Sequence, residues 1–259
     1  MDKLYHYTSM EGFQKIMTGK LTYPKEKSNS IQSSKQMVFH ATHIRYMNDM
    51  MEYVYFKDLL WNSVKDRGVS HCAYENFISK VEIFTFPFIL SFSENCEFLP
   101  MWQMYGNTAS GVMLEFNKDK LSSYFSTLRP CQYIDALEDE YIETCINSIS
   151  RSSWIDTLLD IKDIKKNMSL CKSPHYEYEK EWRIYKRSNI VFTKVSNGII
   201  KPYIEVAVPI DCLDAVVIGP CVNNKEQAKD AIKFLLDSKL TDKEIKVRYS
   251  EINSYRTNM

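Results

Sequence analysis

The pattern of apolar and polar positions begins with a short strand followed by a helix. Leu4 to Tyr7 is an apolar and aromatic run, which favours a strand. A helix is expected from Ser9 to Thr18 because apolar residues recur there at helical spacing. Thr8 and Glu11 have the spacing of a capping box, and Gly19 is a typical helix stop. The chain therefore opens with a strand and a capped helix.

The rest of the chain mixes both kinds of element, with strands gathered in its second half. Apolar residues at helical spacing predict helices at 50–64, 74–81 and 225–236, a short one at 100–105, and a mainly helical segment at 137–170. Apolar and β-branched runs predict strands at 83–92, 111–116, 181–185, 190–192, 203–208, 215–218 and 245–249. Residues 25–36 are rich in serine, lysine and asparagine and predict an exposed loop.

These elements predict an α+β fold in one domain. Strands and helices do not alternate in a steady βαβ rhythm, so a doubly wound parallel sheet is disfavoured. A length of 259 residues suits a single large domain, and no repeat or change of composition marks a boundary. We therefore treat 1–259 as one domain.

Composition narrows the class of protein. Lysine plus arginine and aspartate plus glutamate both number 33, so no net charge favours nucleic acid or an anionic membrane, although a local basic patch stays open. No basic leader with an apolar stretch is visible, and the longest apolar run, Phe84 to Leu90, is too short to span a bilayer. Seven scattered cysteines without a CxxC pair are typical of reduced thiols. We expect a cytoplasmic protein without a membrane partner.

The strongest candidate chemistry is an alternating series of acidic residues. On a strand, Glu177, Glu179, Glu181 and Arg183 would share one face, with Tyr178 turned toward a core. Neighbouring carboxylates repel one another, so a nearby cation or a substrate that becomes positive is expected. Loss of nicotinamide from NAD creates such a centre, because the ribose passes through an oxocarbenium-like transition state. The alternative is a solvated strand edge with an ion pair between Glu181 and Arg183.

Three other groups are candidate ligand contacts, each with a plain structural alternative. His6 could hydrogen-bond a ribose or an amide, or be a satisfied structural histidine. Ser91-Phe92-Ser93 could meet a ligand at the end of a buried strand, or be only a polar strand end. Trp102 and Tyr105 share one helical face and could cover a nicotinamide ring, or belong to the core.

Metal and phosphate-loop motifs are not visible in the sequence. His40, His43, Asp49 and His71 do not form a metal-binding motif such as HExxH, so no metal is expected. The chain has seven glycines and neither GxGxxG nor GxxxxGK[ST], which disfavours dinucleotide binding of the Rossmann type.

Taken in order, these motifs resemble a bacterial family catalogued as domain of unknown function 2971, which is similar to ADP-ribosyltransferases. The resemblance runs over nearly the whole chain. The residues that carry it are Leu4-Tyr5-His6-Tyr7-Thr8-Ser9, Asn48-Asp49 with Glu52, Ser91-Phe92-Ser93-Glu94, Met101-Trp102 with Tyr105 and Gly111, Lys172, Tyr178-Glu179-x-Glu181-Trp182-Arg183 and Ile218-Gly219-Pro220.

The resemblance implies a split, mainly antiparallel β core with flanking helices and NAD as substrate in its cleft. Glu181 would be the catalytic carboxylate, and Glu179 a second catalytic group that serves the acceptor. NAD would contact the other candidates, which are His6, Tyr7, Thr8, Ser91, Phe92, Ser93, Trp102 and Tyr105. His6 stands where arginine is common in that superfamily, and Phe92 where threonine is frequent.

The function implied is an NAD-dependent ADP-ribosyltransferase, a toxin or phage-defence effector that modifies a protein, RNA or DNA. An antitoxin protein would be its natural partner. One alternative is an NAD glycohydrolase, with water as the acceptor. Another is a catalytically inactive module that binds a nucleotide or a partner.

Overall fold

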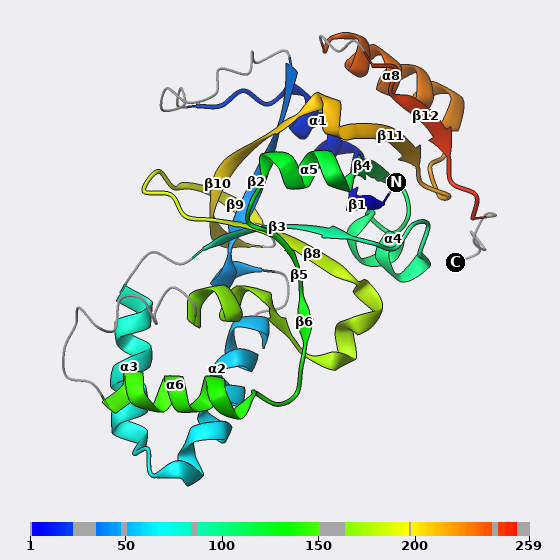
Figure 1. The fold of residues 1–259 in the computed structure, drawn as a ribbon. Coiled ribbons are helices and arrows are strands. Elements are labelled where there is room, and N and C mark those ends of the chain that lie inside the picture. The colour runs from blue at the N-terminus through cyan, green and yellow to red at the C-terminus, as the bar shows by residue number, and fades with distance from the viewer. Residues whose placement is uncertain are drawn as a thin grey trace.

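The computed structural model describes residues 2–22, 35–47, 51–83, 87–150, 164–196, 198–239 and 243–252, and it has an α+β fold (Figure 1). Its centre is an open, mainly antiparallel ten-stranded sheet in which β11 and β12 are parallel. The sheet contains β1 (Lys3–Thr8), β2 (Gln36–His43), β3 (Phe88–Ser93), β4 (Val112–Asn117), β5 (Leu128–Pro130), β8 (Glu181–Lys186), β9 (Phe192–Ser196), β10 (Ile199–Pro209), β11 (Leu213–Ile218) and β12 (Lys246–Tyr249). A separate parallel pair consists of β6 (Gln132–Tyr133) and β7 (Cys171–Lys172).

Several helices flank this sheet. They are α1 (Met10–Thr18), α2 (Met51–Val64), α3 (His71–Ile83), α4 (Leu99–Tyr105), α5 (Lys118–Tyr124), α6 (Asp139–Ser150) and α8 (Lys225–Asp237). Residues 164–170 are also helical. Short 3-10 turns are η2 (Ile44–Tyr46), η3 (Lys65–Arg67), η4 (Pro174–Glu179) and η5 (Ile210–Cys212). No described helix combines the length and the apolar character needed to cross a membrane.

The N-cap of the first helix lies one residue later than predicted. The side chain of Ser9 accepts the backbone N–H of Gly12 at 2.9 Å, so Ser9 is the N-cap. The prediction of Thr8 as the cap is wrong, because Thr8 still belongs to β1 and pairs with Val112. Gly19 ends the helix as predicted.

Other predicted boundaries also differ from the structure; for example, the strand predicted at 203–208 is β10, which begins at Ile199. The run predicted as a strand over 83–92 contains the end of α3 at Ile83 and begins β3 only at Phe88, because a short apolar run does not by itself separate helix from strand. The strand predicted at 190–192 is β9, which begins at Phe192 after the exposed Ile190 and Val191. Most of the predicted loop 25–36 lies outside the described residues, and its last residue, Gln36, begins β2.

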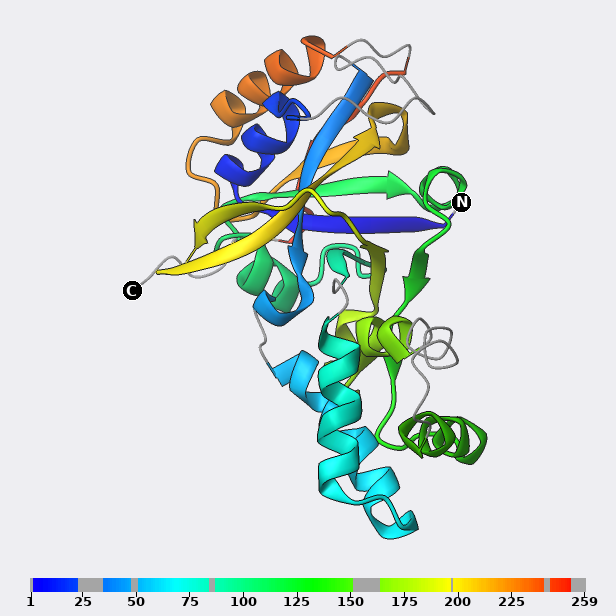
Figure 2. The same ribbon diagram turned by 90° about the vertical axis from the view of Figure 1, so that its left-hand side faces the viewer.

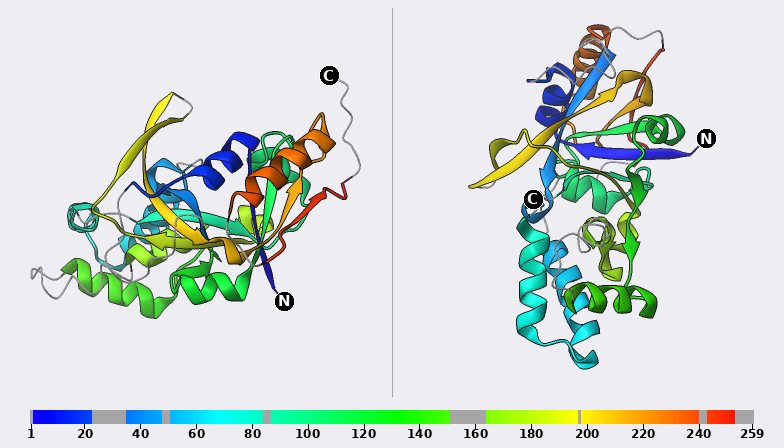
Figure 3. Two further views of the ribbon diagram at one scale, coloured as in Figure 1. Left: turned by 90° about the horizontal axis from the view of Figure 1, so that it is seen from above. Right: turned by 60° about the vertical axis from the view of Figure 1, so that its left-hand side comes forward.

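Three hydrophobic clusters support the structure, and one of them packs α4 against β1, β4 and β11. The other two are larger. The first of these lies between one face of the sheet and the helices α1 and α8, which lie side by side on that face (Figure 2). The second joins α2, α3 and α6 into a helical lobe that extends from the sheet (Figures 2 and 3). Strands from the first and last described parts of the chain, β1 and β12, belong to this one sheet.

The sheet opens at β3, and this opening positions the site. On one edge β3 pairs with β8 over its whole length. On the other edge, β1 pairs with β3 only at Ser93, through Tyr5, whereas β2 pairs with β3 only at Phe88 and Ile89. The strand edge between these contacts is therefore free of a neighbouring strand, and side chains of β1, β2 and β3 surround it.

Candidate functional site

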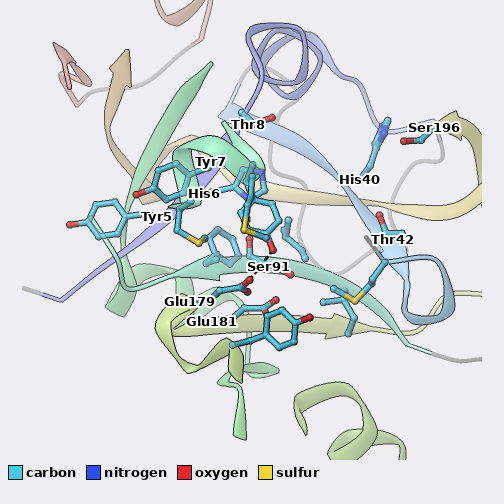
Figure 4. Close-up of a pocket in the computed structure, with 18 of the residues that line it drawn as sticks. Tyr5, His6, Tyr7, Thr8, His40, Thr42, Ser91, Glu179, Glu181 and Ser196 are labelled. Carbon is cyan, nitrogen blue, oxygen red and sulfur yellow. Dashed lines mark hydrogen bonds between the residues drawn. The ribbon is translucent and has the colours of Figure 1, made fainter. Parts of the chain in front are cut away.

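A cavity of about 780 Å³ occupies the opening between β1 and β2. Its volume is typical of sites that hold one small molecule. Figure 4 shows Glu179 and Glu181 together beneath Ser91, whereas His40 and Ser196 lie on the far side of the pocket. One end of the pocket is lined by His6, Ser91, Tyr105, Lys172, Glu179 and Glu181, and the other by His40, Lys194, Ser196 and Lys201.

The acidic series does not form one strand face, which corrects the prediction. Residues 174–179 form the 3-10 turn η4, and β8 begins only at Glu181. Pro174 at the start of the turn and the preceding Ser173, whose side chain accepts the N–H of His175, favour this turn over a strand. Glu177 and Tyr178 are exposed, so neither takes the place predicted for it.

The two remaining glutamates meet across one buried lysine. The Lys172 ammonium donates to Glu179 at 2.5 Å and to Glu181 at 2.9 Å. Both glutamates and the lysine are at most 6% exposed. Lys180, between the two glutamates, has a left-handed backbone with φ of 44°, which ends the turn before the strand begins.

Glu181 is also held by Arg183. The guanidinium donates from Nε to Oε1 and from Nη2 to Oε2, each at 2.8 Å, and its Nη1 donates to the carbonyl of Ser169. Arg183 is fully buried. The predicted ion pair between Glu181 and Arg183 is thus present, but not on a solvated strand edge. Two cations balance two carboxylates at this end of the pocket.

The two carboxyl groups have opposite pKa shifts. Burial alone would raise the pKa of Glu181, but Arg183 and Lys172 outweigh it and lower that pKa below its usual range, with help from a hydrogen bond to the Ser91 side chain. Burial raises the pKa of Glu179, and Lys172 only partly offsets this effect. The site therefore contains a firmly ionised carboxylate beside one that takes up a proton more readily.

His6 presents an acceptor nitrogen to the pocket. Its Nδ1 lies 2.9 Å from the carbonyl oxygen of Ser91, and because a carbonyl only accepts, Nδ1 carries the hydrogen. Burial lowers the pKa of His6, which keeps the ring neutral. Nε2 is then left with a lone pair. Phe39 and Phe92 pack edge-on against the ring and fix its plane.

The two serines of Ser91-Phe92-Ser93 have different surroundings. Ser91 faces the pocket, where its side chain bonds Glu181. Ser93 is fully buried and donates to the backbone carbonyl of Glu179 at 2.6 Å, so it holds the turn rather than facing the pocket. Phe92 is a core residue that also lines the pocket.

Tyr105 lines the pocket and donates to Glu179 at 3.1 Å. Burial raises the pKa of Tyr105, so its hydroxyl stays protonated as a donor. Trp102 is fully buried and packs edge-on against Tyr7, which matches the core alternative for this residue rather than a place in the pocket wall.

Tyr7 and Thr8 of β1 both line the pocket. The Tyr7 hydroxyl donates to the carbonyl of Asn95 and accepts from the N–H of Phe98, so it also anchors the segment after β3. Among the other motif residues named for the family, Asn48, Asp49 and the side chain of Glu52 lie outside the described residues.

The three lysines that line the pocket were not predicted as site residues. Lys172 was named only as part of a family motif, although a cation was expected beside the carboxylates and this expectation could have identified it. Lys194 and Lys201 carry no signal in the sequence, because isolated lysines are common on exposed strands. Within the described ranges, no cluster of three or more histidine, cysteine, aspartate or glutamate side chains could hold a metal ion.

Comparison with known proteins gives one match. Residues 101–184 match the model of a family described as a protein of unknown function (DUF2971). No curated protein and no solved structure matches the chain. The match supports the resemblance to that family over residues 101–184 rather than over nearly the whole chain, and the matched segment contains Tyr105, Lys172, Glu179 and Glu181.

Proposed function

We propose that the pocket binds NAD and that the protein is an ADP-ribosyltransferase acting on a macromolecule in the cytoplasm. The likeness of its open sheet to the ADP-ribosyltransferase fold is part of this proposal. The observation that carries it is the buried pair Glu179 and Glu181, with opposite pKa shifts, in a cavity of about 780 Å³ that also contains the neutral His6. Paired groups with opposite pKa shifts are typical of catalytic sites.

Glu181 would stabilise the positive ribosyl centre. When the bond between C1′ and the nicotinamide nitrogen breaks, its electron pair leaves with nicotinamide and C1′ becomes positive. Arg183, Lys172 and the Ser91 side chain fix the carboxylate before the ligand arrives. A charge held in this way needs no reorganisation when the transition state forms.

Glu179 would accept the proton of the incoming nucleophile. The nucleophile forms a bond to C1′ and its proton passes to the Glu179 carboxylate, so the charges balance. The raised pKa of Glu179 suits this task, because a base works best when its pKa approaches the working pH. His6 would accept a hydrogen bond from a ribose hydroxyl at Nε2 and so orient the sugar.

The proposal is tested by release of nicotinamide from NAD. We expect the purified protein to release nicotinamide, and Glu181→Gln to lower kcat by roughly a hundredfold or more without unfolding the protein. Glu177→Gln is the matched control, because Glu177 lies in the same segment but is exposed. Equal turnover by the wild type and Glu181→Gln would exclude this role. Saturable NAD binding without release would point instead to an inactive binding module.

The acceptor is tested with labelled NAD and cell lysate. Label removed only by protease indicates a protein acceptor, and label removed only by nuclease indicates RNA or DNA. Label found only as free ADP-ribose indicates the NAD glycohydrolase. We propose a toxin or phage-defence role with an antitoxin partner, since an unrestrained NAD consumer harms its own cell. Expression of the wild type, but not of Glu181→Gln, should then arrest growth.

A further inference from the structure

Two lysines face each other at the end of the pocket opposite the glutamates. In the hairpin of β9 and β10, Lys194 is the direct cross-strand neighbour of Lys201, and both line the pocket. Lys201 is only 8% exposed. Most of its side chain is therefore covered by protein, unlike that of a typical surface lysine.

This pair has no acidic partner among the residues that the structure describes. Like charges directly opposite each other on neighbouring strands destabilise a sheet. The acidic residue nearest along the same face of β10 is Glu205, and its carboxylate accepts two hydrogen bonds from Thr22, each at 2.7 Å. The pair is therefore an unbalanced positive charge in a partly dehydrated place.

Neighbouring rings hold this end of the pocket in place. The ammonium of Lys194 lies 5.5 Å from the centre of the Tyr203 ring, and His40 stacks on the same ring at 4.0 Å. Burial, followed by repulsion from Lys201, lowers the pKa of Lys194. Burial and Lys194 also lower the pKa of His40, which leaves it a neutral donor. An anion would relieve the repulsion between the lysines.

We infer that Lys194 and Lys201 form a binding subsite for the diphosphate of a nucleotide. Two ammonium groups with several N–H donors suit the oxygens of a diphosphate, with which they form charge-assisted hydrogen bonds. The placing of this diphosphate rests on the proposed function: a dinucleotide with one ribose at Glu181 would extend its phosphates toward the far side of the pocket (Figure 4).

The subsite is tested by calorimetric binding of ADP and adenosine, which share a nucleoside and differ in the diphosphate. We expect the wild type to bind ADP at least tenfold more tightly than adenosine. Lys194→Gln/Lys201→Gln should abolish this difference. Lys233→Gln is the control, because Lys233 is an exposed lysine on α8 outside the pocket. An unchanged preference for ADP in the double variant, or no preference in the wild type, would overturn the inference.

Turnover separates this inference from the proposed function. A rise in KM for NAD with little change in kcat is expected for the double variant, because a remote subsite contributes binding rather than chemistry. If nicotinamide is released and KM is unchanged, the subsite is wrong while the function stands. If ADP binds through the lysines but nicotinamide is not released, the reverse holds. If the double variant binds ADP as the wild type does but no longer binds a short single-stranded oligonucleotide, the two lysines instead bind nucleic acid.

Discussion

The two ends of the pocket differ in whether their buried charges are paired. At one end Glu179 and Glu181 share Lys172 and Arg183, so every buried charge has a partner. At the other end Lys194 and Lys201 lie opposite each other without an acid among the described residues. A balanced cluster is complete before a ligand arrives and can serve as a fixed electrostatic template. An unbalanced pair is completed by the ligand itself. Removing the charge of a lysine should therefore lower the free energy of unfolding at the first end and raise it at the second.

The largest effect is expected for Lys172→Met. This change leaves two adjacent buried carboxylates with one cation, and breaking a buried ion pair by removing one partner costs about 3–5 kcal/mol. Urea denaturation measures the loss as a change in the free energy of unfolding. Lys233→Met, at an exposed position, should leave that free energy within about 0.5 kcal/mol of the wild type. If Lys172→Met also leaves the free energy of unfolding within about 0.5 kcal/mol of the wild type, the ion pairs of Lys172 do not stabilise the fold.

The pH dependence of Glu181→Gln is the next largest effect. The pKa of Glu181 is lowered in the folded protein, so the ionised group stabilises the fold above the unfolded value of about 4.5, and this stability is lost as the pH falls toward the lowered folded value. The gap in stability between the wild type and Glu181→Gln should narrow by on the order of 2 kcal/mol between pH 7 and the acid limit. Urea titrations at a series of pH values measure it. A gap that stays constant with pH would contradict the assignment, and Glu177→Gln should follow the wild type throughout.

Tyr105→Phe is expected to have a smaller effect. It removes one hydrogen bond to Glu179, worth about 1 kcal/mol. That bond also lowers the pKa of Glu179, so its loss should move the acid limb of the turnover profile to higher pH. Turnover against pH and a thermal melt measure the two consequences. Tyr124→Phe, at an exposed tyrosine, should change neither.

The smallest effect, and one of opposite sign, is expected for Lys194→Gln. Removing one of two facing charges should raise the free energy of unfolding by roughly 0.2–1 kcal/mol at low salt. Added salt should reduce this gain, because it screens the repulsion in the wild type. Denaturation at two ionic strengths measures both. A loss larger than about 1 kcal/mol would show that the contact of Lys194 with the Tyr203 ring outweighs the repulsion from Lys201.

Much of the fold could be predicted because periodicity is a local property. The spacing of apolar residues located α2 to within one residue at its start, and Gly106 ended α4 as predicted. Prediction from local patterns failed where a strand and a turn can have the same pattern of apolar and polar residues. Residues 174–179 alternate like a strand, yet Pro174 and the cap at Ser173 make them a 3-10 turn.

The candidate site could be predicted only in part. Glu181, His6 and Ser91 were named from the sequence, and the structure brings them together: Ser91 bonds His6 through its carbonyl and Glu181 through its side chain. Trp102, named with them, lies in the core. Hydrophobic aromatic residues satisfy core and ligand patterns equally well, so the sequence could not separate the two roles.

The sequence by itself determined many of the helices and strands, although β2, α5 and β5 to β7 were not predicted, and it indicated that the acidic residues near 181 need a cation. Only the tertiary structure decided which cation meets which carboxylate. Lys172 reaches Glu179 and Glu181 from β7, and Lys194 meets Lys201 through the register of a hairpin. Secondary structure follows from repeats of two or 3.6 residues along the chain. Charge pairing depends on distances of a few ångströms between segments, which strand register and packing establish.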